Sequence, residues 1–238
     1  SMRMALVKPF LPLVFLLTVL SLGSIIVFHF CSFHPEYLSL LAFSCDTPWG
    51  LATSLLTHVS YDKHLLPNLE GLLTCTFATF IPIVVLSALT GWSSAWRLSW
   101  GYVIIPLLSH SIILLVQAYL LKAGASFFGM SLAVFSLYGY SLFLTLFTLG
   151  GLVAIMVKGW FFSSAKLRKS LVYILAIVFL NLLLLVIPLL GAGGLPAFLG
   201  AGISQANVAG HLAALLAGLI SGFPVLTVAF RRPAFQKI

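Results

Sequence analysis

Six apolar runs, each about as long as a bilayer is thick, constrain this chain more than any other feature. A helix that rises 1.5 Å per residue needs about 20 apolar residues to cross a hydrocarbon core of about 30 Å. Runs of that length lie at about 9–30, 64–88, 101–122, 126–158, 169–190 and 207–229. Because backbone polar groups in lipid must be satisfied internally, we predict an all-α integral membrane protein with a single domain, residues 1–238.

The charges fit this prediction and indicate an orientation. Only 7% of the residues are charged, and the formal net charge is +8. Nucleic-acid binding is not expected, because Lys and Arg lie at the ends of the apolar runs and form no basic patch. Six spans place both termini on one side, and of the 12 basic residues only Lys63 and Lys122 fall opposite. The positive-inside rule then predicts a multi-pass protein with both termini in the cytoplasm.

The first connection, from about Cys31 to Lys63, is long and carries its own apolar pieces. Such loops are often functional, and these pieces are too short to span, so we expect the loop to lie at the external membrane surface. Cys31 and Cys45 both fall in this connection, and whether they pair stays open. The cysteine spacing is not that of a metal site, and we expect neither a metal nor a cofactor.

Three other segments leave alternatives open. The segment "GWSSAWRLSW" is predicted to be an interfacial loop before the third span. The glycine-rich connection 191–205 is either a lid over a cavity or a plain loop against the headgroups. The stretch 126–160 would measure about 52 Å as one helix, so either Gly150 and Gly151 break it or it begins within the membrane at Ser126.

A possible partner for Ser126 comes from two stripes of small residues. The first contains Ser126, Gly129, Ala133 and Ser136, and the second contains His211, Ala214, Gly218 and Gly222. Small residues at helical spacing let two helices pack closely, which is also the alternative explanation of both stripes. Contact between the stripes would bring the Ser126 hydroxyl to the His211 imidazole, the arrangement in which a general base activates a nucleophile.

Donors for an oxyanion can be named in the second span. His64 and Asn68 are four residues apart at its external start, so they share one helical face. Each can donate a hydrogen bond to a developing oxyanion, although two interfacial polar residues would look the same. No acid is placed to orient His211, so the predicted site is a Ser–His dyad and not a triad.

Four segments in this order resemble the rhomboid family of intramembrane serine proteases. They are the long first loop with Trp49, "HLLPN" for His-x-x-x-Asn, "GASF" for Gly-x-Ser-Gly, and "GHLAALLAG" for His-x-x-Gly-x-x-x-Gly. The resemblance implies a six-helix rhomboid-like bundle with a membrane-associated first external loop. It also implies Ser126 as nucleophile, His211 as general base, and an oxyanion hole made by Asn68, His64 and the Ser126 backbone N–H.

The resemblance further implies a substrate pocket lined by Phe127, Met130 and Gly124, near the external face. The partners would be transmembrane protein substrates within the lipid bilayer, cut near their external ends, and the fifth span with the last loop would form a movable gate. Phe127 stands where the family has its second Gly, and Met130 stands where an aromatic often packs on the histidine. The alternative is therefore a catalytically inactive rhomboid-fold protein that binds transmembrane helices. A small transporter is not favoured, because the sequence has no internal repeat.

Overall fold

The computed structural model describes residues 7–120, 127, 129–159, 164–202 and 207–230. Within these ranges six helices are long and apolar enough to cross a membrane, which confirms the predicted number of spans. The long helices are α2 (Leu11–Phe33), α5 (Leu66–Thr90), α6 (Trp92–Leu115), α7 (Ser131–Gly159), α8 (Ala165–Gly191) and α10 (Val208–Phe230). The short elements are η1 (Lys8–Phe10), α3 (Glu36–Leu41), α4 (Gly50–Thr53), η2 (Ser54–Leu56), the π-helices η3 (Tyr61–Leu65) and η4 (Val116–Leu120), and α9 (Leu195–Phe198).

The start of the third span differs from the prediction. The helix α6 begins at Trp92, so the predicted interfacial loop "GWSSAWRLSW" is wrong, and most of it is the first turns of α6. Gly91 makes the turn from α5 with a φ of 101°, and no Gly or Pro breaks the residues after it up to Trp100. The Arg97 guanidinium donates to the Val228 carbonyl at 2.9 Å, near the end of α10. A basic side chain at a helix C-terminus satisfies carbonyls that have no partner within the helix, which stabilises this early start.

The start of the fourth span also differs. The helix α7 begins at Ser131, later than the predicted 126, and it runs without a break through Gly150 and Gly151. Phe127 is extended instead, because its backbone exchanges two hydrogen bonds with Phe43 of the first loop at 2.9 and 3.1 Å. A positive φ of 84° at Gly129 then turns the chain into α7.

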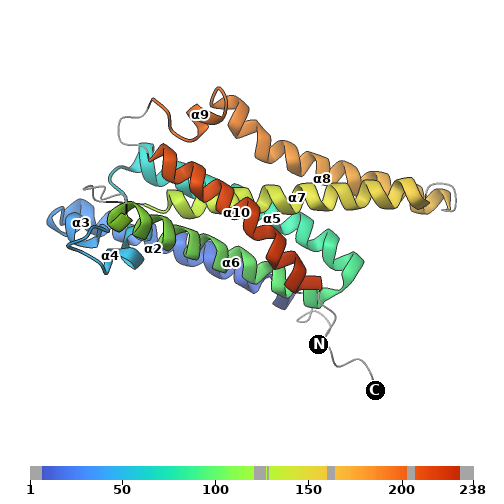
Figure 1. Cartoon of the computed structure of the whole chain (residues 1–238), viewed down its shortest axis with the longest axis horizontal. Helices are drawn as coiled ribbons and strands as arrows, with labels where there is room; N and C mark the ends of the chain where they lie inside the picture. Colours follow the sequence, from blue (N-terminus) through green and yellow to red (C-terminus); the bar gives the residue numbers. More distant parts are fainter. Residues whose placement is uncertain (1–6, 121–126, 128, 160–163, 203–206, 231–238) are drawn as a thin grey trace, which may run out of the picture.

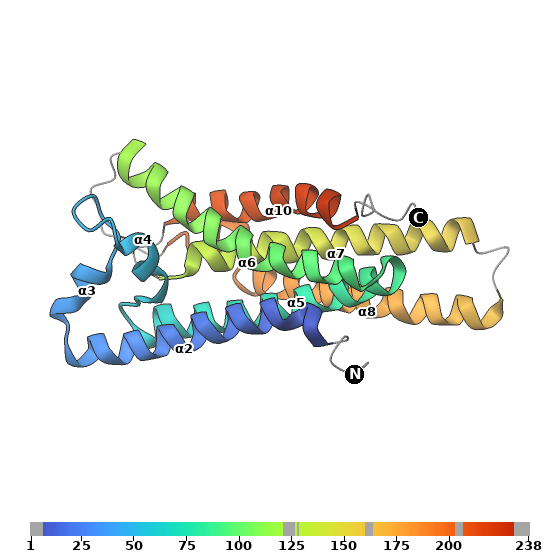
Figure 2. The ribbon, with the colours of Figure 1, turned by 90° about the horizontal axis from the view of Figure 1, so that it is seen from below.

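The helix α7 lies in the middle of the bundle and packs against α5, α6, α8 and α10 (Figures 1 and 2). Its contact with α10 is close, because a Cβ added at Gly139 would overlap the Leu215 carbonyl and one added at Gly218 would overlap the Ser136 carbonyl. The predicted contact between the two stripes of small residues is therefore confirmed at Ser136 and Gly218. This contact brings the start of α10 to the start of α7.

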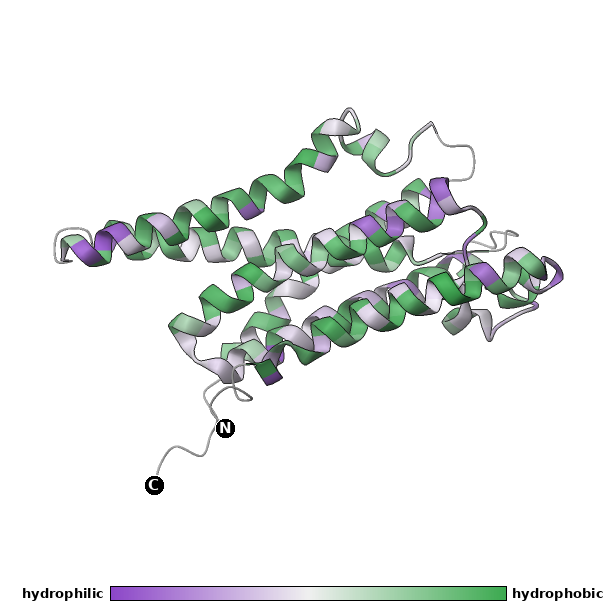
Figure 3. Ribbon diagram, turned by 180° about the vertical axis from the view of Figure 1, so that it is seen from behind, coloured by the Kyte–Doolittle hydropathy of each residue, from purple (hydrophilic) through white to green (hydrophobic). Residues whose placement is uncertain are grey.

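The two ends of the bundle differ. The short helices α3 and α4 lie at one end, called the loop end, whereas α2 begins and α10 ends away from it, short of the joined ends of α7 and α8 (Figure 1). The helices are coloured as apolar over most of their length, with hydrophilic residues at the joined ends of α7 and α8 (Figure 3). A long helix with apolar residues around most of its circumference is typical of a membrane span.

The first loop folds into short helices at the loop end. The Trp49 indole donates to the Leu40 carbonyl at 2.7 Å, which joins the two helical pieces on either side of the turn. Cys31 is buried and Cys45 is exposed, and both are free thiols. The sequence left the pairing of Cys31 and Cys45 open, and in the structure they do not form a disulfide.

The helix α8 is the most peripheral of the long helices. It packs on α7 at the end away from the loop end, where Leu171 and Val178 contact Leu152. Near its middle the Asn181 amide donates to the Ala78 carbonyl and to the Thr145 hydroxyl, at 2.8 and 2.9 Å. Beyond this point α8 leans away from α7 and α10 toward α9 (Figure 1).

Candidate functional site

A serine and a histidine from the two close-packed helices meet at the loop end. The His211 Nε2 lies 3.0 Å from the Oγ of Ser131, the first residue of α7. The His211 Nδ1 lies 2.8 Å from the Leu199 carbonyl oxygen, which can only accept, so Nδ1 carries the ring proton. The Nε2 lone pair is then free to accept the Ser131 hydroxyl proton, which is the tautomer that a general base needs.

The imidazole of His211 is also held from its face. Phe135, one turn after Ser131, stacks on it with ring centroids 4.4 Å apart and planes at 27°. Phe198 of α9 in turn packs edge-on against Phe135 at 5.3 Å. The described part of the last connection therefore packs on this site, through the Phe198 ring and the Leu199 carbonyl.

A second Ser–His pair lies deeper in the protein. The Ser54 Oγ is 3.3 Å from the His110 Nε2, and these residues are only 0% and 1% exposed. A nucleophile must reach a substrate, and this pair is sealed. Ser131 is only partly buried, so the geometry favours the pair of Ser131 and His211 as the chemical site.

The His64 ring lies against the turn that precedes Ser131. A Cβ added at Gly129 would overlap the His64 ring, with its Cε1 only 2.7 Å away. The Val59 N–H donates to the His64 Nδ1 at 3.5 Å, so Nε2 carries the ring proton. His64 therefore presents an N–H donor beside the start of α7.

Asn68 is linked to the same turn. Its Nδ2 donates to the His64 carbonyl at 2.8 Å, which uses one of its two amide hydrogens. His64 lies in the π-helix η3 and Asn68 in the first turn of α5. Pro67 follows Leu66, whose N–H donates to the Tyr61 carbonyl, so the helix continues from η3 into α5 through the proline. The two predicted oxyanion donors are thus held one turn apart, as their spacing indicates.

His58 stands behind His64 and outside the spans. Its side chain is 2% exposed, and its ring centroid is 4.9 Å from that of His64. Burial, with a smaller contribution from His64, lowers the pKa of His58 to about 4. His58 is therefore neutral near pH 7 and adds no charge beside the donor.

The predicted nucleophile Ser126, with the predicted pocket residue Gly124, lies outside the described residues. Its pairing with His211 stays a prediction, and the described serine that bonds to His211 is Ser131. A sequence signal for Ser131 exists. The segment "GMS" has the same Gly-x-Ser spacing as "GAS", and Phe135 supplies the aromatic residue one turn later.

The other two predicted pocket residues, Phe127 and Met130, lie within the described part of the chain. The Phe127 ring packs near the Phe43 ring, with centroids 6.5 Å apart. Met130 is 0% exposed and belongs to the main hydrophobic core. Their role in binding a substrate stays a prediction.

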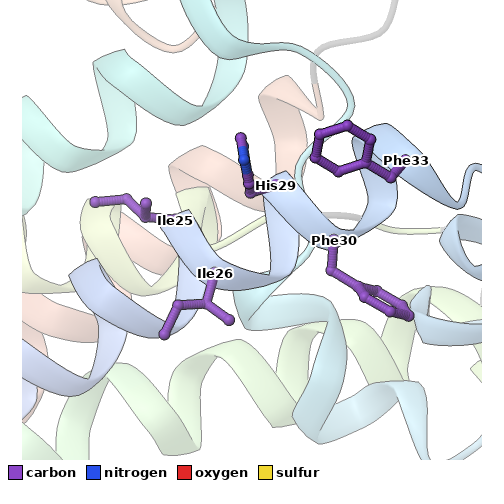
Figure 4. A pocket seen from close by; sticks show the side chains of 5 residues that line it. All are labelled: Ile25, Ile26, His29, Phe30 and Phe33. Atoms are coloured by element: carbon purple, nitrogen blue, oxygen red, sulfur yellow. The ribbon is translucent and has the colours of Figure 1, made fainter.

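A surface hollow elsewhere does not compete with this site. It is lined by Ile25, Ile26, His29, Phe30 and Phe33, all from the loop-end half of α2 (Figure 4). A hollow on one apolar outer helix is expected to be filled by lipid. No family model, curated protein or solved structure matches the chain.

Proposed function

We propose that this protein is an intramembrane serine protease that uses Ser131 as nucleophile and His211 as general base. The observation that carries the proposal is the 3.0 Å contact between Ser131 Oγ and His211 Nε2, together with the 2.8 Å bond from Nδ1 to Leu199 that fixes the tautomer. The buried pair of Ser54 and His110 lacks this second anchor, because among the described residues the His110 Nδ1 has no hydrogen-bond partner. The backbone carbonyl takes the orienting role that a carboxylate has in a triad.

The chemistry follows from the two bonds. The Ser131 oxygen attacks the scissile carbonyl while its proton passes to His211 Nε2. The imidazolium keeps its Nδ1–H on the Leu199 carbonyl, and it then gives the Nε2 proton to the leaving amine as the C–N bond breaks. Water hydrolyses the resulting acyl ester by the same transfers in reverse order, and Ser131 is regenerated.

Oxyanion stabilisation is assigned to three donors. The first is the Ser131 backbone N–H, since the first amides of a helix have no partner within that helix. The others are the His64 Nε2–H, which faces the turn at Gly129, and the second amide hydrogen of Asn68. Each such donor typically contributes a factor of about 10²–10³ to kcat.

The substrate class follows from the surroundings of the pair. Ser131 and His211 lie at the ends of two apolar spans, so a peptide bond that reaches them belongs to a membrane-embedded or membrane-adjacent segment. The side on which α8 leans away from the bundle is the proposed entry side for a substrate helix (Figure 1). This arrangement agrees with the rhomboid resemblance of the sequence.

Labelling with a fluorophosphonate tests the proposal. The purified protein should be labelled, Ser131→Ala should not, and Ser126→Ala and Ser54→Ala should label like the wild type. Loss of labelling in Ser126→Ala alone would return the nucleophile to Ser126. An inert wild type would instead favour a non-catalytic protein that binds transmembrane helices.

A further inference from the structure

Two amide side chains form a reciprocal pair between the end of the third span and the start of the sixth. Gln117 lies in η4, and Asn207 directly precedes α10. The Gln117 Nε2 donates to Asn207 Oδ1 and the Asn207 Nδ2 donates to Gln117 Oε1, both at 2.8 Å. Because each amide is both donor and acceptor, this pairing fixes the position and the plane of both side chains.

Asn207 also holds the first turn of α10. Its Oδ1 accepts from the Gly210 N–H at 3.0 Å, and its backbone carbonyl accepts from the His211 N–H at 2.8 Å. This is the N-cap arrangement, which satisfies amides that have no partner within the helix. A Cβ at Gly210 would approach the Asn207 Cγ to 2.6 Å, so the amide lies directly against the turn that carries His211.

Other contacts of α10 do not replace this cap. The close contacts with α7 are made at Leu215 and Gly218, one and two turns after His211. They fix the helix axis, whereas the first turn of a helix can open unless its amides are capped. The Leu199 carbonyl and the Phe135 ring hold the imidazole itself, whereas the backbone turn that carries it depends on Asn207. The orientation of the Asn207 amide in turn depends on Gln117.

We propose, on the basis of the proposed function, that Gln117 is a positioning residue for His211 that acts through Asn207. By holding the Asn207 amide it keeps the first turn of α10 closed and the His211 Nε2 within reach of the Ser131 Oγ. Without Gln117, the Asn207 Oδ1 loses the donor that bonds to it and the Asn207 Nδ2 loses its acceptor, so the amide turns toward other partners. His211 then spends less time in the orientation that accepts the Ser131 proton.

The test uses the full chain in detergent and the inactivation constants of a fluorophosphonate. Gln117→Met removes both hydrogen bonds and keeps the length of the side chain. We expect kinact to fall between about threefold and tenfold, the range that corresponds to one net hydrogen bond, while KI stays unchanged. Gln117→Glu keeps the acceptor for Asn207 Nδ2 and should lose less.

A double-mutant cycle shows whether the effect passes through Asn207. Glycine is tolerated as an N-cap, so Asn207→Gly removes the amide and keeps the helix start. Gln117→Met should then cause no further loss of kinact in the Asn207→Gly background. Thr76→Val is the matched control, because it removes another interhelical hydrogen bond, to the Tyr102 hydroxyl, away from the proposed gate and should leave kinact unchanged.

The outcomes separate this inference from the proposed function. If the wild type shows no Ser131-dependent labelling, the proposed function fails and this inference fails with it. If the wild type is labelled but Gln117→Met has a wild-type kinact, or loses the same factor in the Asn207→Gly background, only the positioning role is overturned. Should Gln117→Met not fold, Gln117→Glu in the same cycle decides the question.

Discussion

Substitution of Gly129 by alanine should lower both kcat and the free energy of unfolding, through two separate effects. The φ of 84° is unfavourable for a residue with a Cβ, by about 1–2 kcal/mol. The new Cβ would also lie 2.7 Å from the His64 Cε1, which is 0.7 Å inside the 3.4 Å at which ordinary contact begins. The His64 ring must therefore move away from the start of α7.

The size of the catalytic effect follows from that displacement. An oxyanion donor shifted by a large fraction of an ångström is close to a donor removed, which typically reduces kcat by about 10²–10³. We expect Gly129→Ala to reduce kcat by about 10² and the free energy of unfolding by about 1–2 kcal/mol. Cleavage of a transmembrane peptide and thermal unfolding in detergent measure the two quantities.

Gly91→Ala is the matched control. Gly91 has a φ of 101°, but a Cβ there would have no other atom within 4 Å. It should show a similar loss of stability with an unchanged kcat. If Gly129→Ala retains the kcat of this control, or if it reduces kcat equally in a His64→Ala background, the His64 ring is not the donor that the substitution displaces.

Three further predictions concern the surroundings of the site. Phe135→Ala removes the ring stacked on His211, and an aromatic pair is worth about 0.5–1.5 kcal/mol. The kcat should therefore fall by up to about tenfold, while the apparent Kd for an inert substrate analogue stays unchanged. Asn181→Leu removes two interhelical hydrogen bonds of about 0.6 kcal/mol each, so it should lower the free energy of unfolding by about 1 kcal/mol. Denaturant titration in micelles measures this quantity, and a stabilised variant would contradict the prediction. The pKa of His58 is about 4 in the folded protein against 6.5 for an ordinary histidine, so the unfolded chain binds the additional proton between these values. Stability is thus full above about pH 6.5 and falls as the pH drops toward 4, and His58→Gln should flatten this part of the profile; equal slopes would refute it.

The sequence was most informative where the determinant was local. A run of about 20 apolar residues has few structural options, so all six spans could be drawn from hydropathy alone. The contact between the small-residue stripes was likewise readable, because close helix packing needs small side chains at helical spacing. The spacing of His64 and Asn68 placed them one turn apart, and the hydrogen bond between Asn68 Nδ2 and the His64 carbonyl agrees with it.

The ends of the helices were harder to predict from the sequence, because contacts with residues distant in the sequence determine where a helix begins. The early start of α6 depends on the Arg97 contact with the end of α10, which lies far away in the sequence. The pair of Gln117 and Asn207 joins the end of one span to the residue that precedes another, and nothing in either segment alone indicates the other. Hydropathy predicts neither of these two contacts, because each is made by polar groups near the ends of apolar runs.

The choice between Ser126 and Ser131 depends on one such distant contact. Both serines follow a glycine by two positions, and a helix that began at residue 126 would place Ser126 on the stripe of small residues with Ala133. The extended pairing of Phe127 with Phe43 excludes helix at that position. The chain then turns at Gly129, and Ser131 becomes the first residue of α7 with its hydroxyl on His211. The first loop therefore sets where α7 begins and so places Ser131 on His211, and substitutions that break the Phe43 pairing act on the site through the start of α7.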